Sequence, residues 1–156
     1  MKMIDVGAKP KTERVAVARG FVTMSRATIA RIRRGDVEKG DVLAAARLAG
    51  VMAAKKTPDI VPLCHPIALS AVDVTAETGP GGVLLTATVR STVRTGVEME
   101  ALAAVMAGCL TVYDMLKRYE RGMSIRAVEL LHKSGGRTGD WTREASARKR
   151  PGRARR

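Results

Sequence analysis

The chain has 156 residues, the size of one ordinary domain; 46% are hydrophobic and 28% are charged. This composition excludes an intrinsically disordered chain, and no segment approaches the roughly 20 apolar residues of a bilayer span. Residues 1–5 lack the apolar core of a secretory signal, and two cysteines cannot form a disulfide framework. We therefore expect a cytoplasmic protein with reduced thiols and no membrane association.

Positive charge is concentrated at the carboxyl end. The formal net charge is +13, and residues 141–156 carry seven Arg or Lys against one Glu. This composition, without apolar periodicity, predicts a single domain over residues 1–143 and a disordered basic tail over 144–156. The tail would retain nucleic acid only non-specifically, whereas the moderately basic body favours an anionic ligand.

The first half of the domain predicts one strand and two helices. Apolar residues among small ones indicate a strand over residues 14–24. Ser25 is a suitable N-cap for a helix to residue 34, and Gly35 a suitable stop. Helical spacing of apolar residues predicts a second helix over 42–56, which Pro58 would end.

The second half predicts a hairpin, a long helix and a last strand. Alternating residues indicate strands over 68–77 and 83–94, joined by a turn that contains Gly79, Pro80, Gly81 and Gly82. The period then becomes helical over residues 97–119, with Gly122 as the stop, and a strand follows over 125–131.

This order predicts an α+β fold. If the two early helices form one connection, the pattern is that of a ferredoxin-like antiparallel sheet with helices on one face, plus an extra N-terminal helix. The other face of the sheet would then need a cover, such as another subunit.

Two segments carry candidate ligand-binding groups. The loop Leu63-Cys64-His65 holds a histidine, the usual proton carrier near neutral pH, although by spacing alone a loop histidine more often has no role. Adjacent Cys and His splay apart, so no metal site is expected. Glu98 and Glu100 lie in a helix first turn, where the dipole favours carboxylates, and either could bind the guanidine-like edge of a base.

Three lysines and an aspartate are further candidates. Asp114 and Lys117 lie three apart in the apolar half of a helix, and their spacing fits a surface ion pair or an acid–base pair equally. Lys39 lies where a loop leads into a helix, and a cation beside the amides of a helix amino end suits phosphate, although a solvated lysine is the commoner case. Lys133 and Arg137 flank a glycine-rich segment that lacks P-loop spacing, so this motif alone is weak.

Taken together, six segments resemble the cyclic pyranopterin monophosphate synthase family, MoaC, of molybdenum cofactor biosynthesis. They occur in the family's order and span nearly all of residues 4–141. The segments are Phe21-Val22-Thr23-Met24, Lys39-Gly40-Asp41-Val42, Ile60-Val61-Pro62-Leu63-Cys64-His65-Pro66, Thr95-Gly96-Val97-Glu98-Met99-Glu100-Ala101-Leu102, Tyr113-Asp114-Met115-Leu116-Lys117 and Lys133-Ser134-Gly135-Gly136-Arg137-Thr138-Gly139-Asp140.

The resemblance implies a lyase that converts 3′,8-cyclo-7,8-dihydroguanosine 5′-triphosphate to cyclic pyranopterin monophosphate and pyrophosphate. It also implies a homohexamer, a trimer of dimers with sites between subunits. The implied catalytic residues are Asp114, Lys117 and Lys39. The implied substrate-binding residues are Leu63, Cys64, His65, Glu98, Met99, Glu100 and, for phosphate charge, Lys133.

No cofactor is required by this interpretation, and Mg²⁺ could accompany the triphosphate without a carboxylate cage to demand it. The alternative interpretation is a basic ferredoxin-like module that binds nucleic acid. Such sheets stack bases on aromatic residues, and only 3% of this chain is aromatic.

The resemblance places both Glu98 and Asp114 at the active site. On one straight helix they would lie about 24 Å apart along the axis, too far apart for one chain to supply both to a single site. We therefore predict that two chains share each site.

Overall fold

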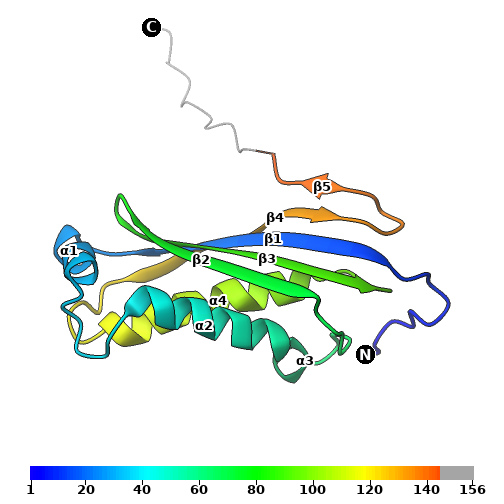
Figure 1. Cartoon of the computed structure of the whole chain (residues 1–156), viewed down its shortest axis with the longest axis horizontal. Coiled ribbons are helices and arrows are strands. Elements are labelled where there is room, and N and C mark those ends of the chain that lie inside the picture. Colours follow the sequence, from blue (N-terminus) through cyan, green and yellow to red (C-terminus); the bar gives the residue numbers. More distant parts are fainter. Residues whose placement is uncertain (145–156) are drawn as a thin grey trace, which may run out of the picture.

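The computed structural model describes residues 1–144 as an antiparallel sheet with helices on one face (Figure 1). The predicted tail lies outside the described residues, apart from Glu144. The elements in chain order are β1 (Thr12–Thr23), α1 (Arg26–Arg34), α2 (Val42–Lys55), α3 (Thr57–Ile60), β2 (Ala71–Gly79), β3 (Gly82–Val93), α4 (Glu98–Leu116), β4 (Ser124–Ser134) and β5 (Trp141–Thr142).

The predicted helix boundaries are confirmed where a capping residue defines them. The Ser25 side chain accepts a hydrogen bond from the amide of Thr28, and Gly35 ends α1 in the left-handed region at φ 68°. The Asp41 side chain caps α2 in the same way. Pro58, expected only as a stop, instead lies in the first turn of the short helix α3, because proline needs no amide hydrogen there.

The sheet has the strand order β2-β3-β1-β4-β5. The ferredoxin-like prediction is confirmed, with β1 and β3 central and the β2–β3 hairpin turning at Pro80 and Gly81. Strand β4 is longer than predicted, and β5 was not predicted because two residues carry no periodic signal. Helix α4 ends at Leu116, three residues before the predicted end, and a turn follows it.

Glycine residues lie at the places where helix α4 packs most closely against the sheet and against α2. A Cβ on Gly108 would lie 2.3 Å from Leu85 Cδ2, and one on Gly50 would lie 3.0 Å from the carbonyl oxygen of Ala104. A Cβ on Gly20 of β1 would lie 2.5 Å from a methyl of Val105. The absence of these Cβ atoms lets the backbones approach closely.

The buried core lies between the sheet and these helices. Alternate residues of the central strands, including Ala16, Ala18, Leu85 and Val89, are fully buried on the helix face. By length and composition alone α4 could cross a membrane, so the expectation of no such segment was too strict. Half of that stretch is buried inside the domain, as in a core helix.

We expect the Gly108→Ala variant to be less stable by up to about 2 kcal/mol. Alanine gains about 1 kcal/mol in helix propensity, but overpacking against the buried Leu85 costs about 1–3 kcal/mol and should prevail. Urea unfolding followed by circular dichroism measures the change. Gly79→Ala, where a Cβ meets nothing within 4 Å, is the control. Equal stability of the two variants would contradict this packing argument.

Candidate functional site

The two ends of α4 carry two separate groups of charged and polar residues. Glu98 begins the helix and Asp114 lies near its end, 16 residues later on one continuous helix. At 1.5 Å per residue these positions are about 24 Å apart along the axis. The expectation of one unbroken helix is confirmed, so the two groups must be considered separately.

At the carboxyl end of α4, Asp114 lies between two lysines. The Lys117 ammonium is 2.6 Å from Asp114 Oδ1, and the Lys39 ammonium is 2.5 Å from Oδ2. Lys39 comes from the loop before α2, and it also donates to the main-chain oxygen of Asp114. All three side chains are about half exposed, so the cluster is open to a ligand.

The two ammonium groups lower the pKa of Asp114 to about 2, chiefly through their hydrogen bonds to the carboxylate. At neutral pH Asp114 is therefore an anion that can accept a proton but has none to donate. Proton donors in this cluster are the lysines. The neighbouring loop is fixed by an ion pair between Glu38 and Arg118 and by the Tyr119 hydroxyl, which accepts from the amide of Glu38.

At the amino end of α4, Glu100 is buried against Cys64. The thiol of Cys64 donates a hydrogen bond to Glu100 Oε1 at 3.5 Å. Glu100 is only 1% exposed, and its Oε2 has no hydrogen-bond partner among residues 1–144. Burial raises the pKa of Glu100. Burial, and then the nearby Glu100, raise the pKa of Cys64 to about 11, so this cysteine is a thiol at neutral pH.

The other substrate-binding candidates lie near this end. Leu63 and His65 flank Cys64 in the loop that reaches Glu100, and Met99 lies beside Glu100 in the first turn of α4. Leu63 and Met99 are 49% and 40% exposed, and His65 is half-buried. The structure therefore brings Cys64 and Glu100 into contact, with their neighbours available to a ligand.

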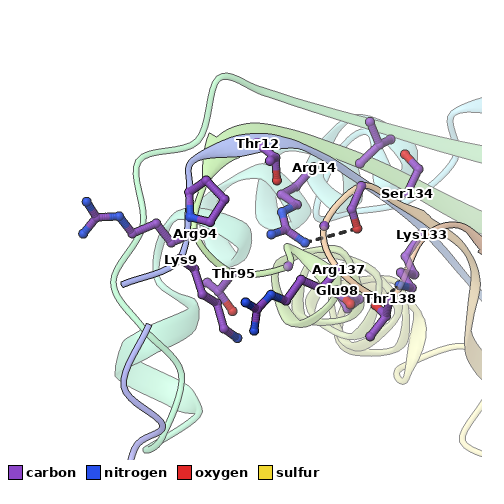
Figure 2. Close-up of a pocket in the computed structure, with 15 residues that line it drawn as sticks. Lys9, Thr12, Arg14, Arg94, Thr95, Glu98, Lys133, Ser134, Arg137 and Thr138 are labelled. Carbon is purple, nitrogen blue, oxygen red and sulfur yellow. Dashed lines mark hydrogen bonds between the residues drawn. The ribbon is translucent and has the colours of Figure 1, made fainter. Parts of the chain in front are cut away.

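A pocket of about 440 Å³ lies where β1, the start of α4 and the glycine-rich loop after β4 meet (Figure 2). Among the described residues that line this pocket, Glu98 is the one with a carboxylate. Five cationic residues also line it: Lys9, Arg14, Arg94, Lys133 and Arg137. This excess of positive charge suits an anion with several charges.

Sequence reasoning found Lys133 but missed Arg14 as a pocket residue. The Lys133 ammonium donates to Thr138 Oγ1 at 2.5 Å and to the oxygen of Gly139 at 2.6 Å, so one of its three hydrogens remains for a ligand. Arg14 shares the helix face of β1 with the buried Ala16 and Ala18. A charged residue at a core-facing strand position was the available signal.

The structure separates two lysines that the sequence interpretation assigned to phosphate. Lys39 contacts Asp114 at the carboxyl end of α4, whereas Lys133 lines the pocket near Glu98 at the amino end. Within one chain the two lysines cannot hold the same phosphate group. Over residues 1–144, no group of three or more His, Cys, Asp or Glu side chains could hold a metal ion.

Comparisons with known proteins agree on one family. The model of the MoaC family matches residues 3–136. Proteins named cyclic pyranopterin monophosphate synthase are similar to this chain. The one from Novosphingobium aromaticivorans is 54% identical over 140 residues, covering 90% of this chain and 89% of the relative. That from Cereibacter sphaeroides is 54% identical over 147 residues (93% and 91%), and that from Thermomicrobium roseum 52% over 145 (92% and 87%).

We expect Lys39→Met to raise the pKa of Asp114 from about 2 toward its ordinary value of 3.8. Because the folded-state pKa is lowered, the cluster's contribution to stability is present above about pH 4 and is lost as pH falls toward 2. A pH titration of the Asp114 side-chain carbon by NMR measures the shift. Lys55→Met, which removes an exposed ammonium from α2, is the control. An unchanged Asp114 pKa in Lys39→Met would refute the ion-pair geometry.

Proposed function

This chain belongs to the MoaC family, and we propose on that premise that it forms cyclic pyranopterin monophosphate in molybdenum cofactor biosynthesis. The carrying observation is about 54% identity over nine-tenths of the chain to enzymes named for this product. The reaction is that of a lyase: 3′,8-cyclo-7,8-dihydroguanosine 5′-triphosphate gives cyclic pyranopterin monophosphate and pyrophosphate.

The Asp114 cluster supplies the proton transfers in this proposal. Rebuilding a guanine-derived ring into a pterin requires several proton transfers and attack by water on carbon. In this proposal Asp114 accepts a proton and Lys117 donates one, and their contact at 2.6 Å lets a proton pass between the two side chains. Lys39 holds the other carboxylate oxygen and keeps Asp114 anionic.

The phosphate chemistry requires positive charge at a second place. A ribose-derived hydroxyl attacks the α-phosphorus and gives up its proton to a base or to solvent; the new P–O bond forms as the bond to pyrophosphate breaks. The basic pocket beside Glu98 supports binding of the leaving group, because its five cations can offset that charge. No cofactor is needed, although Mg²⁺ could enter with the triphosphate.

A site shared between two chains would reconcile the two groups with one substrate. Met99, Met106 and Leu110 form an apolar stripe along the outer side of α4, and Met106 and Leu110 are 59% and 62% exposed. A second α4 packed antiparallel on this stripe would bury it and bring Glu98 of one subunit toward Asp114 of the other. The exposed stripe supports a homo-oligomer. We propose a hexamer of three such dimers, and a cytoplasmic location, on the family resemblance alone.

Incubation with the cyclic dihydroguanosine triphosphate, followed by pyrophosphate detection, tests the function. We expect Asp114→Asn and Lys117→Ala each to reduce pyrophosphate release by about 10²–10⁴-fold, the usual contribution of a general acid or base. Asp36→Asn, which removes an exposed partner of Arg31, should retain wild-type turnover. Near-normal turnover in Asp114→Asn or in Lys117→Ala would exclude the substituted residue from proton transfer. No turnover by wild type, with retention on RNA, would favour the nucleic-acid-binding alternative.

Mixed oligomers test the shared site. Glu98→Gln and Asp114→Asn should each be inactive alone, but in a mixed dimer one site receives both changes and the other receives neither. Co-folded mixtures should recover up to about a quarter of wild-type activity if subunits pair at random. Inactive mixtures, with mixed assembly verified by mass spectrometry, would mean that both residues act from one chain.

A further inference from the structure

The loop that carries Lys39 runs beside the end of α4 (Figure 1). Its residue Val37 is buried in the core, and the amide of Gly40 donates to the oxygen of Val37 at 2.9 Å. Residues 37–40 therefore form a tight turn, here called the Lys39 turn, with Glu38 and Lys39 at its corners. The Lys39 side chain is half exposed, so its place depends on what holds this turn.

Tyr119 holds the Lys39 turn at its first corner. The Tyr119 hydroxyl accepts a hydrogen bond at 3.0 Å from the amide of Glu38, the residue directly before Lys39. Its half-buried ring packs against the core, and the guanidinium of Arg31 lies 4.4 Å from the ring centre. Because the ring is held in this way, its hydroxyl restrains the backbone at Glu38.

Tyr119 lies on the same rigid unit as Asp114. The amide of Tyr119 donates at 2.8 Å to the oxygen of Leu116, so a turn continues directly from the last residue of α4. The carboxylate of Glu120 then accepts a hydrogen bond at 3.0 Å from the amide of Ser25, which fixes this turn to the start of α1. The Tyr119 hydroxyl and the Asp114 carboxylate therefore keep a set separation.

The Lys39 turn contacts this unit through its main chain and through its side chains. The Lys39 ammonium lies 2.5 Å from Asp114 Oδ2, and the amide of the preceding residue is bound to Tyr119. The ion pair between Glu38 and Arg118 is a further contact, but its side chains are 66% and 72% exposed, and such pairs contribute little. A lysine side chain is flexible, so a fixed backbone reduces the entropy lost when Lys39 is ordered on Asp114.

We propose that Tyr119 is a positioning residue for the proton-transfer group: its hydroxyl holds the amide of Glu38 and thereby places the Lys39 ammonium on Asp114. The catalytic consequence of this role rests on the proposed function. Its physical content does not, because removal of the hydroxyl should weaken the contact between Lys39 and Asp114 in the protein without substrate.

A pH titration of the Asp114 side-chain carbon by NMR in Tyr119→Phe tests this contact. The variant keeps the ring and removes only the hydroxyl, so we expect the pKa of Asp114 to rise from about 2 toward 3.8, but by less than in Lys39→Met. Tyr113→Phe is the matched control, because it removes the chain's other tyrosine hydroxyl, which donates to a main-chain oxygen outside the Lys39 turn. An unchanged pKa in Tyr119→Phe, or an equal rise in the two variants, would overturn the proposal.

A double variant separates positioning from a general loss of structure. If Tyr119 acts through Lys39, adding Tyr119→Phe to Lys39→Met should raise the pKa of Asp114 no further. A merely structural role would raise it in either background. A further rise as large as the one that Tyr119→Phe causes alone would therefore refute the positioning role.

Amide hydrogen exchange tests the hydrogen bond itself. In the wild type we expect the Glu38 amide to exchange at least about tenfold more slowly than in an unstructured chain, and we expect Tyr119→Phe to lose this protection. The wild-type measurement needs no substitution, so it decides the matter if Tyr119→Phe does not fold. Unprotected exchange at Glu38 in the wild type would contradict the proposal.

Steady-state kinetics separate this proposal from the proposed function. If both hold, Tyr119→Phe should lower kcat about 3- to 30-fold with little change in KM, because it displaces a proton-transfer group and not a binding group. If the pKa of Asp114 responds but the wild type does not turn over the substrate, the proposed function fails and the Tyr119 contact stands. If the wild type is active and kcat is unchanged in Tyr119→Phe, only the positioning role fails.

Discussion

Close packing of α4 on the sheet and on α2 is the constraint on which the rest of the structure depends. At Gly20, Gly50 and Gly108 a single Cβ would meet a buried neighbour at 2.5, 3.0 and 2.3 Å. The helix is therefore held along its length, and it is uninterrupted from Glu98 to Leu116. A rigid helix of this length keeps its two ends, and the groups that they carry, at a set separation.

The two ends place acidic residues in opposite environments. Asp114 is half exposed between two ammonium groups, which lower its pKa to about 2. Glu100 is buried with one oxygen unpartnered, and burial raises its pKa. The pKa values of two carboxyl groups on one helix are thus shifted in opposite directions.

Local sequence signals predicted the helices, the long strands and the hairpin turn well. They predicted poorly the features that are very short or that depend on distant parts of the chain. Ser25 and Gly35 defined the ends of α1 because capping depends on neighbours within a few residues. The turn at Pro80 and Gly81 was equally local. Strand β5 exists because Trp141 and Thr142 pair with β4, a contact that leaves no periodic pattern in two residues. The α4 end was placed three residues late, since apolar spacing continues to Tyr119 beyond the last helical turn.

The sequence by itself determined the strand and helix order, and with it the ferredoxin-like fold; its six ordered segments also identified the family. Only the tertiary structure decided which charges meet. Lys39 reaches Asp114 across 75 residues, and Arg14 reaches Gly135 across 121. The second contact depends on the pairing of Val15 with Ser134 in a β1–β4 register that shifts twice along its length. Such registers are set by packing over the whole sheet, because no local pattern specifies how two distant strands align.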